Sequence, residues 1–294
     1  MSDALTIDEA LPLGAVAVQR VLDRAGVRSL MIKGSAFAEL GVRSPKAGND
    51  IDLLIDRSDR DPALAALASA GWITVSPRTP GALEGLHYST TMRHPHLIPS
   101  LDLHHTFAGL LDAPGAFEAM WVERTTIELA HQPVAVPCVE HAALLEALNA
   151  LKDTRPADWP QVSHWLADAC DHLDVDLLSA SAEPIGARHS AAPFITALGG
   201  AAPDESVPTG YEEWVSGAGR TYSYRALRHT LRRAPHLLPW TMWWLLTLNE
   251  EAARLWASTH GVEYRGRWRL VATRVASRVP EPWVARVRRK WTWS

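Results

Sequence analysis

The chain has 294 residues, of which 47% are hydrophobic and 21% charged, a composition that excludes a long disordered protein and allows one or two folded domains. Its net charge of -4 is uneven: residues 220–294 hold 14 arginines and one lysine against four glutamates, which gives +11 there and leaves -15 on the remainder. Such a basic part indicates docking to the acidic body, an anionic substrate or a nucleic acid.

The first half of the chain alternates helical and strand-like segments. Apolar spacing predicts a helix over residues 6–25, a strand in "VRSLMIKG" and a short helix in "SAFAELG". A second strand, "DIDLLID", and a helix, "DPALAALASAG", follow. This succession is typical of an α/β protein.

The next segments add a hairpin and then helices. "LEGLHYSTTMRHPHLIPSLDLHHTF" reads as two strands joined at "RHPH", and "AFEAMWVERTTIEL" as a helix and a strand. The pattern is helical from Glu140 onward. We therefore expect an α/β (α+β) fold with a small mixed sheet and flanking helices. Its expected parts are a core over 1–135, a helical region closing a cleft over 136–200, a linker over 201–219 and a basic, Trp-rich helical region over 220–294.

Two carboxylates open the second strand. Side chains alternate in a strand, so Asp50 and Asp52 share a face about 7 Å apart and repel each other unless a cation lies between them. Oxygen ligands of this kind suit Mg²⁺. On this pair alone, solvated acids at a strand end are the favoured explanation.

Two flanking motifs favour the metal. Lys33, Gly34 and Ser35 lie between a strand and a short helix, where free backbone N–H groups accommodate a phosphate. Downstream, Asp102 in "LDLHH" supplies a third acid, and His104 follows on the same face of its strand.

These motifs resemble a known family. "KGSAFAELGVRSPKAGNDIDLLID" is similar to the signature of the DNA polymerase β-like nucleotidyltransferases, and is closest to the bacterial branch called uncharacterised nucleotidyltransferases. The resemblance covers about residues 5–200. It departs from the branch at Lys46, where arginine is usual, and at Leu40-Gly41, where an aromatic residue is usual.

The resemblance implies a reaction and roles for the motif residues. Asp50, Asp52 and Asp102 would hold two Mg²⁺ ions, with Asp102 also near enough to an acceptor hydroxyl to act as its base. Gly34 and Ser35 would bind the triphosphate of an NTP, with ATP as the first candidate. The enzyme would move an NMP to a hydroxyl or phosphate of a small-molecule or peptide acceptor and release pyrophosphate. The remaining candidate binding residues, expected to neutralise phosphate or to contact the acceptor, are Lys33, Lys46 and His104. For Lys33 a solvated surface position, and for His104 a structural, hydrogen-bonded role, stay open.

Two other functions stay open. The basic C-terminal part indicates an RNA or tRNA acceptor, as in toxin-like relatives, and the two departures from the branch indicate a degenerate binding or scaffold module. The late tryptophans suit helical packing, nucleic-acid stacking, acceptor binding or a membrane surface.

The remaining candidate ligand residues fit no site in the sequence. A zinc site is not favoured, since five clustered histidines match no standard ligand spacing: His87, His94, His96, His104 and His105. Cys138 and Cys170 are expected to be buried thiols without chemistry. The acidic N-terminal residues and the lack of any run of about eighteen apolar residues predict a cytoplasmic protein without a transmembrane segment.

Overall fold

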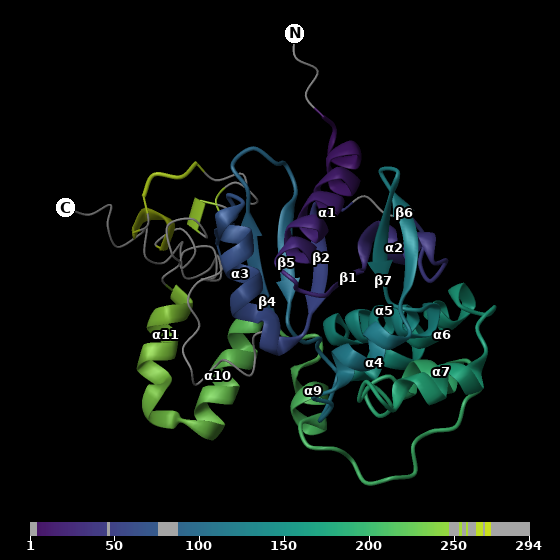
Figure 1. Cartoon of the computed structure of the whole chain (residues 1–294). Coiled ribbons are helices and arrows are strands. Elements are labelled where there is room, and N and C mark those ends of the chain that lie inside the picture. Colours follow the sequence, from purple (N-terminus) through teal and green to yellow (C-terminus); the bar gives the residue numbers. More distant parts are fainter. Residues whose placement is uncertain are drawn as a thin grey trace. The chain divides into compact units, whose positions relative to one another are not determined.

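The computed structural model describes residues 5–45, 48–75 and 88–246, with short pieces at 253–254, 257, 263–266 and 268–271. The chain forms two compact units (Figure 1). The first comprises residues 1–74 and 85–225, and the second comprises 75–84 and 226–294.

A five-stranded mixed sheet forms the centre of the first unit, so the α/β fold expected from the sequence is confirmed. Its order is β1-β2-β5-β4-β3, and β2 and β5 are its one parallel pair among the described strands. The strands are β1 (Ser29–Ile32), β2 (Asp50–Ile55), β3 (Ile73–Thr74), β4 (Ser89–Arg93) and β5 (Ser100–His104). The predicted hairpin is therefore present as antiparallel β4 and β5.

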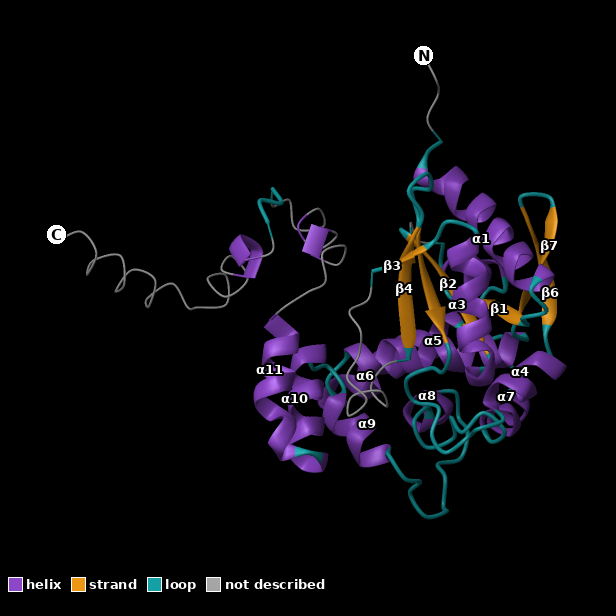
Figure 2. Cartoon of the chain, turned by 60° about the vertical axis from the view of Figure 1, so that its left-hand side comes forward, coloured by secondary structure: helices purple, strands orange, loops and turns teal. Residues whose placement is uncertain are grey.

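One face of the sheet is covered by α1 (Ile7–Arg24), which contacts β1, β2 and α3 (Arg60–Ser69) (Figure 2). Thr6 and Glu9 begin α1 with a reciprocal capping box, which satisfies N–H groups that a helix start otherwise leaves open. A Cβ at Gly14 would lie 2.8 Å from the Ile51 side chain, so glycine allows the close approach of α1 to β2. Ile51 therefore points toward α1, and the alternating acids of β2 point to the opposite face.

A two-stranded antiparallel hairpin, β6 (Thr125–Leu129) and β7 (Gln132–Val136), lies beside β1. The buried Gln19 of α1 joins the two sheets, since its amide donates to the carbonyl of Ser29 and accepts from the N–H of Ala135 at 3.1 Å. Because a buried amide is costly without partners, these bonds fix the position of the hairpin on the core.

Further helices complete the first unit, and all of them except α2 (Gly34–Glu39) gather beyond one end of the sheet (Figure 2). They are α2 (Gly34–Glu39), α4 (Ala116–Val122), α5 (Val139–Asp153), α6 (Trp159–Ala169), α7 (Val175–Ala182), α8 (Ala192–Ala197) and α9 (Tyr211–Gly217). Short 3-10 turns lie at Arg57–Asp59 and Pro156–Asp158. A continuous apolar core includes the sheet and these helices. Residues 201–219, expected to be a linker, belong to this unit and contain α9.

The basic C-terminal part contains α10 (Tyr222–Arg233), which begins in the first unit, a 3-10 turn at Pro235–Leu237 and α11 (Leu238–Leu246). In the second unit the Thr230 and Thr241 hydroxyls bond at 3.1 Å. Trp240 and Trp243 are about half exposed, so these two side chains are not core residues. Of the described helices, none has the length and apolar character needed to cross a bilayer.

Candidate active site

Asp52 and Asp102 lie directly opposite each other on β2 and β5. Asp50 precedes Asp52 by two residues on the same strand and therefore has the same facing. The sheet thus brings the three predicted acids to one face, although Asp52 and Asp102 are 50 positions apart in the sequence. Asp50 is exposed, Asp102 is partly exposed and Asp52 is buried.

Two side chains hold the buried Asp52. Lys33 Nζ donates to Asp52 Oδ1 at 2.7 Å, and His104 Nε2 lies 2.8 Å from the same oxygen. The side chains are 16% exposed for Lys33, 7% for Asp52 and 1% for His104. The buried carboxylate therefore has the paired charge that it needs to remain ionised.

The protonation states follow from these contacts. Burial raises the pKa of Asp52, but the His104 hydrogen bond and the charge of Lys33 outweigh this effect, so the pKa is lowered overall. Burial lowers the pKa of Lys33, and the attraction to Asp52 reverses this, so that pKa is raised overall. Burial lowers the pKa of His104 against the opposing effect of Asp52. A neutral His104 that donates from Nε2 to an ionised Asp52 fits these directions.

Asp50 has the opposite tendency. Although Asp50 is an exposed residue, partial screening of its carboxyl group from water raises its pKa, and repulsion from the carboxylates of Asp52 and Asp102 raises it further. Lys33 offsets only part of this effect. The cluster therefore has more negative charge than its one lysine neutralises.

Asp102 is held from the neighbouring strand. Thr91 lies opposite Asp102 on β4, and its hydroxyl donates to Asp102 Oδ1 at 2.6 Å. In the described part of the chain, the hydrogen bonds to Asp52 and Asp102 all end on Oδ1. The Oδ2 atoms are therefore available as ligands.

The donor set fits a hard divalent cation. Ligand atoms of Asp52, Asp102 and His104 lie within 4.8 Å of one another. Carboxylate oxygens are the ligands that Mg²⁺ prefers, whereas the His104 nitrogen is engaged with Asp52. The acids are thus suited to hold the ion, and His104 to orient one of them.

The predicted phosphate-binding residues lie at the start of α2. Lys33 (φ 60°, ψ -160°) and Gly34 (φ 49°) both have positive φ angles, and the backbone conformation of Lys33 is one that favours glycine and is strained for lysine. The first N–H groups of a helix have no intrahelical partner, and Ser35 is exposed in this turn. The turn also directs Lys33 toward Asp52. Lys46, the remaining predicted binding residue, lies outside the described residues.

Four residues at the site were not found from the sequence: Thr91, Tyr88, Phe107 and Lys152. The ring of Tyr88 stacks on His104 with centroids 5.7 Å apart, and Lys152 Nζ lies 5.4 Å from the centroid of that ring. Phe107 lies 5.6 Å from Lys33 Nζ. Lys152 belongs to α5, so the helical region also contributes to the site. Tyr88, Thr91 and Phe107 lie in or next to the strands in the sequence, which does not distinguish them from core residues, and Lys152 carries no local signal at all.

The described histidines of this cluster lie in different surroundings. His94 and His96 have ring centroids 5.7 Å apart after β4, and His104 is bonded to Asp52. Neither His94 nor His96 belongs to a three-ligand cluster of described residues. His87 lies outside the described part of the chain.

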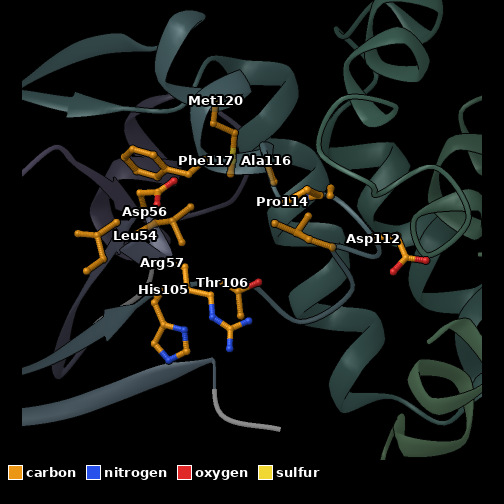
Figure 3. Close-up of a pocket in the computed structure, with 13 residues that line it drawn as sticks. Leu54, Asp56, Arg57, His105, Thr106, Asp112, Pro114, Ala116, Phe117 and Met120 are labelled. Carbon is orange, nitrogen blue, oxygen red and sulfur yellow. The ribbon is translucent and has the colours of Figure 1, made fainter. Parts of the chain in front are cut away.

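A separate pocket of about 330 Å³ lies where β2 and β5 end (Figure 3). His105, Thr106 and Arg57 lie near one another on one side, while Phe117 and Met120 of α4 form an apolar side. None of the three aspartates lines this pocket. It is therefore distinct from the acidic cluster.

The family described as "Uncharacterised nucleotidyltransferase" matches residues 10–196, more than half of the chain. The chain belongs to this family. The match contains the start of α2, the three aspartates and helices α5 to α7. The family expected from the resemblance is therefore confirmed, and the protein is a nucleotidyltransferase.

Solved structures give more distant similarities. The antibiotic-resistance factor ANT(2'')-Ia is 16% identical, with 61% of this chain and 93% of that chain covered and a TM-score of 0.40. The lincosamide antibiotic adenylyltransferase LnuA is 14% identical, with 54% and 93% covered and a TM-score of 0.34. An antigenic nucleotidyltransferase-like protein from Paracoccidioides brasiliensis is 16% identical, with 66% and 94% covered and a TM-score of 0.39. No curated protein matches the chain.

Proposed function

We propose that this nucleotidyltransferase moves a nucleoside monophosphate from an NTP to a hydroxyl of a small-molecule or peptide acceptor, with ATP as the first donor to test. The observation that carries the proposal is the pairing of Asp52 with Asp102 across parallel strands, with Asp50 on the same face. Three carboxylates in this arrangement suit a reaction on a polyphosphate that needs divalent cations. Their retention also argues against a degenerate binding module.

Asp50, Asp52 and Asp102 would hold the cations. Two bound Mg²⁺ ions would neutralise phosphate charge and lower the pKa of the acceptor hydroxyl. Lys33 and His104 keep Asp52 ionised and oriented through Oδ1. Thr91 does the same for Asp102 from the neighbouring strand.

The chain's own groups account for donor binding and proton transfer. N–H groups at Gly34 and Ser35 bind oxygens of the triphosphate at the start of α2. Asp102 accepts the proton of the acceptor hydroxyl, whose oxygen forms a bond to the α-phosphorus. The bond from that phosphorus to the bridging oxygen breaks, and pyrophosphate leaves. Tyr88 and Lys152 form a wall beside His104 against which the reactants pack.

The test is incubation of the full chain with Mg²⁺, each of four NTPs and a panel of hydroxyl-bearing acceptors. Pyrophosphate release and a mass gain of one nucleotide on the acceptor are the expected results. Asp50→Asn should abolish both, whereas Asp61→Asn, which alters an exposed acid of α3, is the matched control and should not. Transfer at the wild-type rate by Asp50→Asn would contradict the assignment of Asp50 as a metal ligand.

A second candidate acceptor is RNA, favoured by the charge of +11 over residues 220–294. An RNA acceptor predicts binding that weakens steeply with salt, because each phosphate contact releases counterions. Replacement of Arg228 and Arg232 of α10 by alanine should then reduce the salt dependence. Absence of tRNA binding at low salt would reject this candidate and leave the small-molecule or peptide acceptor.

A further inference from the structure

A second group of ligand-type side chains lies at the base of the β6–β7 hairpin. Glu123 is the C-cap of α4, Cys138 is the N-cap of α5 and His141 lies in the first turn of α5. Ligand atoms of the three residues lie within 4.8 Å of one another. This group, hereafter the thiol cluster, shares no residue with the three aspartates.

The distances in the thiol cluster are those of a metal site. Cys138 Sγ lies 3.2 Å from His141 Nδ1 and 3.9 Å from Glu123 Oε2, and the latter two atoms are 3.8 Å apart. With Zn–S of about 2.3 Å and Zn–N and Zn–O of about 2.0–2.1 Å, a tetrahedral site has ligand separations of roughly 3.3–3.6 Å. Shifts of a few tenths of an ångström bring the three atoms to that geometry.

Cys138 is an unusual residue for the start of a helix. Serine, threonine, aspartate and asparagine are the usual N-cap residues because their oxygen accepts from the helix N–H groups. Cys138 makes no side-chain capping bond, and its sulfur lies near the His141 backbone as well as near His141 Nδ1 and Glu123 Oε2. The sulfur is therefore within reach of both other ligand atoms.

The histidine is buried and directed at the same point. His141 is 0% exposed and faces the sulfur with Nδ1. Its other nitrogen, Nε2, has no hydrogen-bond partner within the described residues, and the Ser181 backbone lies near the ring. Metal-bound histidines commonly have their second nitrogen directed at a backbone carbonyl, which fixes the ring.

The surroundings are electronegative. The carboxylates of Glu123 and Glu140 both lie near the Cys138 sulfur. A divalent cation bound by the three ligand atoms would offset this negative charge.

We propose that the thiol cluster binds one Zn²⁺ ion, with the Cys138 thiolate, His141 Nδ1 and a Glu123 oxygen as ligands. One sulfur, one imidazole nitrogen and one carboxylate form a donor set that suits zinc and does not suit Mg²⁺. Glu123 is exposed and Cys138 half-buried, so water completes the fourth position. The thiol proton leaves to solvent on binding. Because Thr125 pairs with Val136 at the hairpin base, the ion links α4, the hairpin and α5.

The test uses the full chain, freed of metal with a chelator and then titrated with Co²⁺ and Zn²⁺. Co²⁺ should produce the near-ultraviolet thiolate-to-cobalt charge-transfer absorption, which an all-oxygen site cannot produce, and one equivalent of Zn²⁺ should remove it. Cys138→Ser should abolish the absorption. Glu123→Gln, an exposed change that preserves folding, should weaken Zn²⁺ binding by more than the roughly 10–100-fold typical of an outer-shell change.

Two controls separate this site from others. Cys170→Ala removes the other thiol, which donates to the Val42 carbonyl, and should leave the absorption unchanged. Asp102→Asn should also leave it unchanged, because the thiol cluster is separate from the aspartates. A wild-type chain without the absorption, or a Cys138→Ser chain that binds Zn²⁺ as tightly as wild type, would overturn the proposal.

Discussion

Asp52 and Asp102 occupy paired positions on the parallel strands β2 and β5, and each is held through Oδ1 by a partner from outside the pair. Lys33 holds the first and Thr91 the second. This arrangement leaves the Oδ2 atoms for shared ligands. The proposed metal site therefore depends on side chains that have no ligand role themselves.

Asp102→Asn is expected to lower kcat for nucleotidyl transfer by at least about 100-fold, the usual loss for one transition-state stabiliser. The amide keeps the hydrogen bond from Thr91 but neither takes up the acceptor proton nor carries charge for a cation. Single-turnover rates at saturating NTP and Mg²⁺ measure the effect. Asp102→Asn chains with wild-type rates would exclude Asp102 from the proposed chemistry.

Thr91→Val tests the support of Asp102 by β4. Valine has the shape of threonine but no hydroxyl, so Asp102 loses its 2.6 Å hydrogen bond. We expect Mg²⁺ affinity to fall by about 10–100-fold, as for other groups that orient metal ligands. Thr91→Ser retains the hydroxyl and is the matched control. Equal Mg²⁺ affinity in Thr91→Val and Thr91→Ser would contradict the assignment.

Lys33→Met is expected to destabilise the metal-free protein. Removal of one partner from a buried pair leaves an unpaired charge on Asp52, at a typical cost of about 3–5 kcal/mol. Urea unfolding measures the difference. The double variant with Asp52→Asn should be less destabilised than Lys33→Met alone, because the uncompensated charge is gone; an equal or larger loss would show that the ion pair is not the cause.

The raised pKa of Asp50 predicts an effect of pH on metal binding. A carboxylate with a raised pKa takes up its proton at a higher pH than an ordinary aspartate, so Mg²⁺ affinity should begin to fall at correspondingly higher pH during acidification. Mg²⁺ titrations across the acidic range measure this dependence. A dependence that starts only at the ordinary aspartate pKa would contradict it.

The raised pKa of Asp50 also makes the stability of the folded protein depend on pH, in the opposite direction to metal binding. The folded chain holds the Asp50 proton more tightly than the unfolded chain. In the absence of metal, the free energy of unfolding therefore falls as pH rises through the raised pKa of Asp50. Asp50→Asn should therefore have a higher Tm than wild type at neutral pH, with the difference vanishing in acid. Added Mg²⁺ should raise the Tm of wild type more than that of the variant.

Local patterns predicted much of this site, and long-range register accounts for the rest. Alternation in "DIDLLID" placed Asp50 and Asp52 on one face, and proline in "RHPH" placed the hairpin end. The pairing of β2 with β5 joins segments separated by α3, β3 and β4, and a one-residue slip would turn Asp102 to the other face. Thr91 depends on the same register, so nothing local identified it.

The thiol cluster illustrates a further limit. Cys138 and Cys170 have no metal-type spacing, and the sequence predicted buried thiols. Cys170 is buried, whereas Cys138 is only partly buried. The β6–β7 hairpin brings Glu123 beside Cys138 across fourteen intervening residues, and the first turn of α5 adds His141. Glu123 comes from the end of α4, whereas Cys138 and His141 come from the start of α5, so no short motif records the group.

Substitutions of Tyr88 test whether the aromatic ring beside His104 contributes to activity. Its ring stacks on His104 and so supports the histidine that bonds Asp52. The Lys152 ammonium group lies over the same ring, which fixes the position of that side chain. Tyr88→Leu removes the aromatic face, whereas Tyr88→Phe keeps it and removes only the hydroxyl. We expect Tyr88→Leu to lower kcat/KM by roughly tenfold, which corresponds to the loss of about 1–2 kcal/mol from one stacked and one cation–π contact. Tyr88→Phe should retain most of the activity, and steady-state kinetics with both variants measures the difference. If both variants lost activity equally, the hydroxyl and not the ring face would be the group that matters at this position.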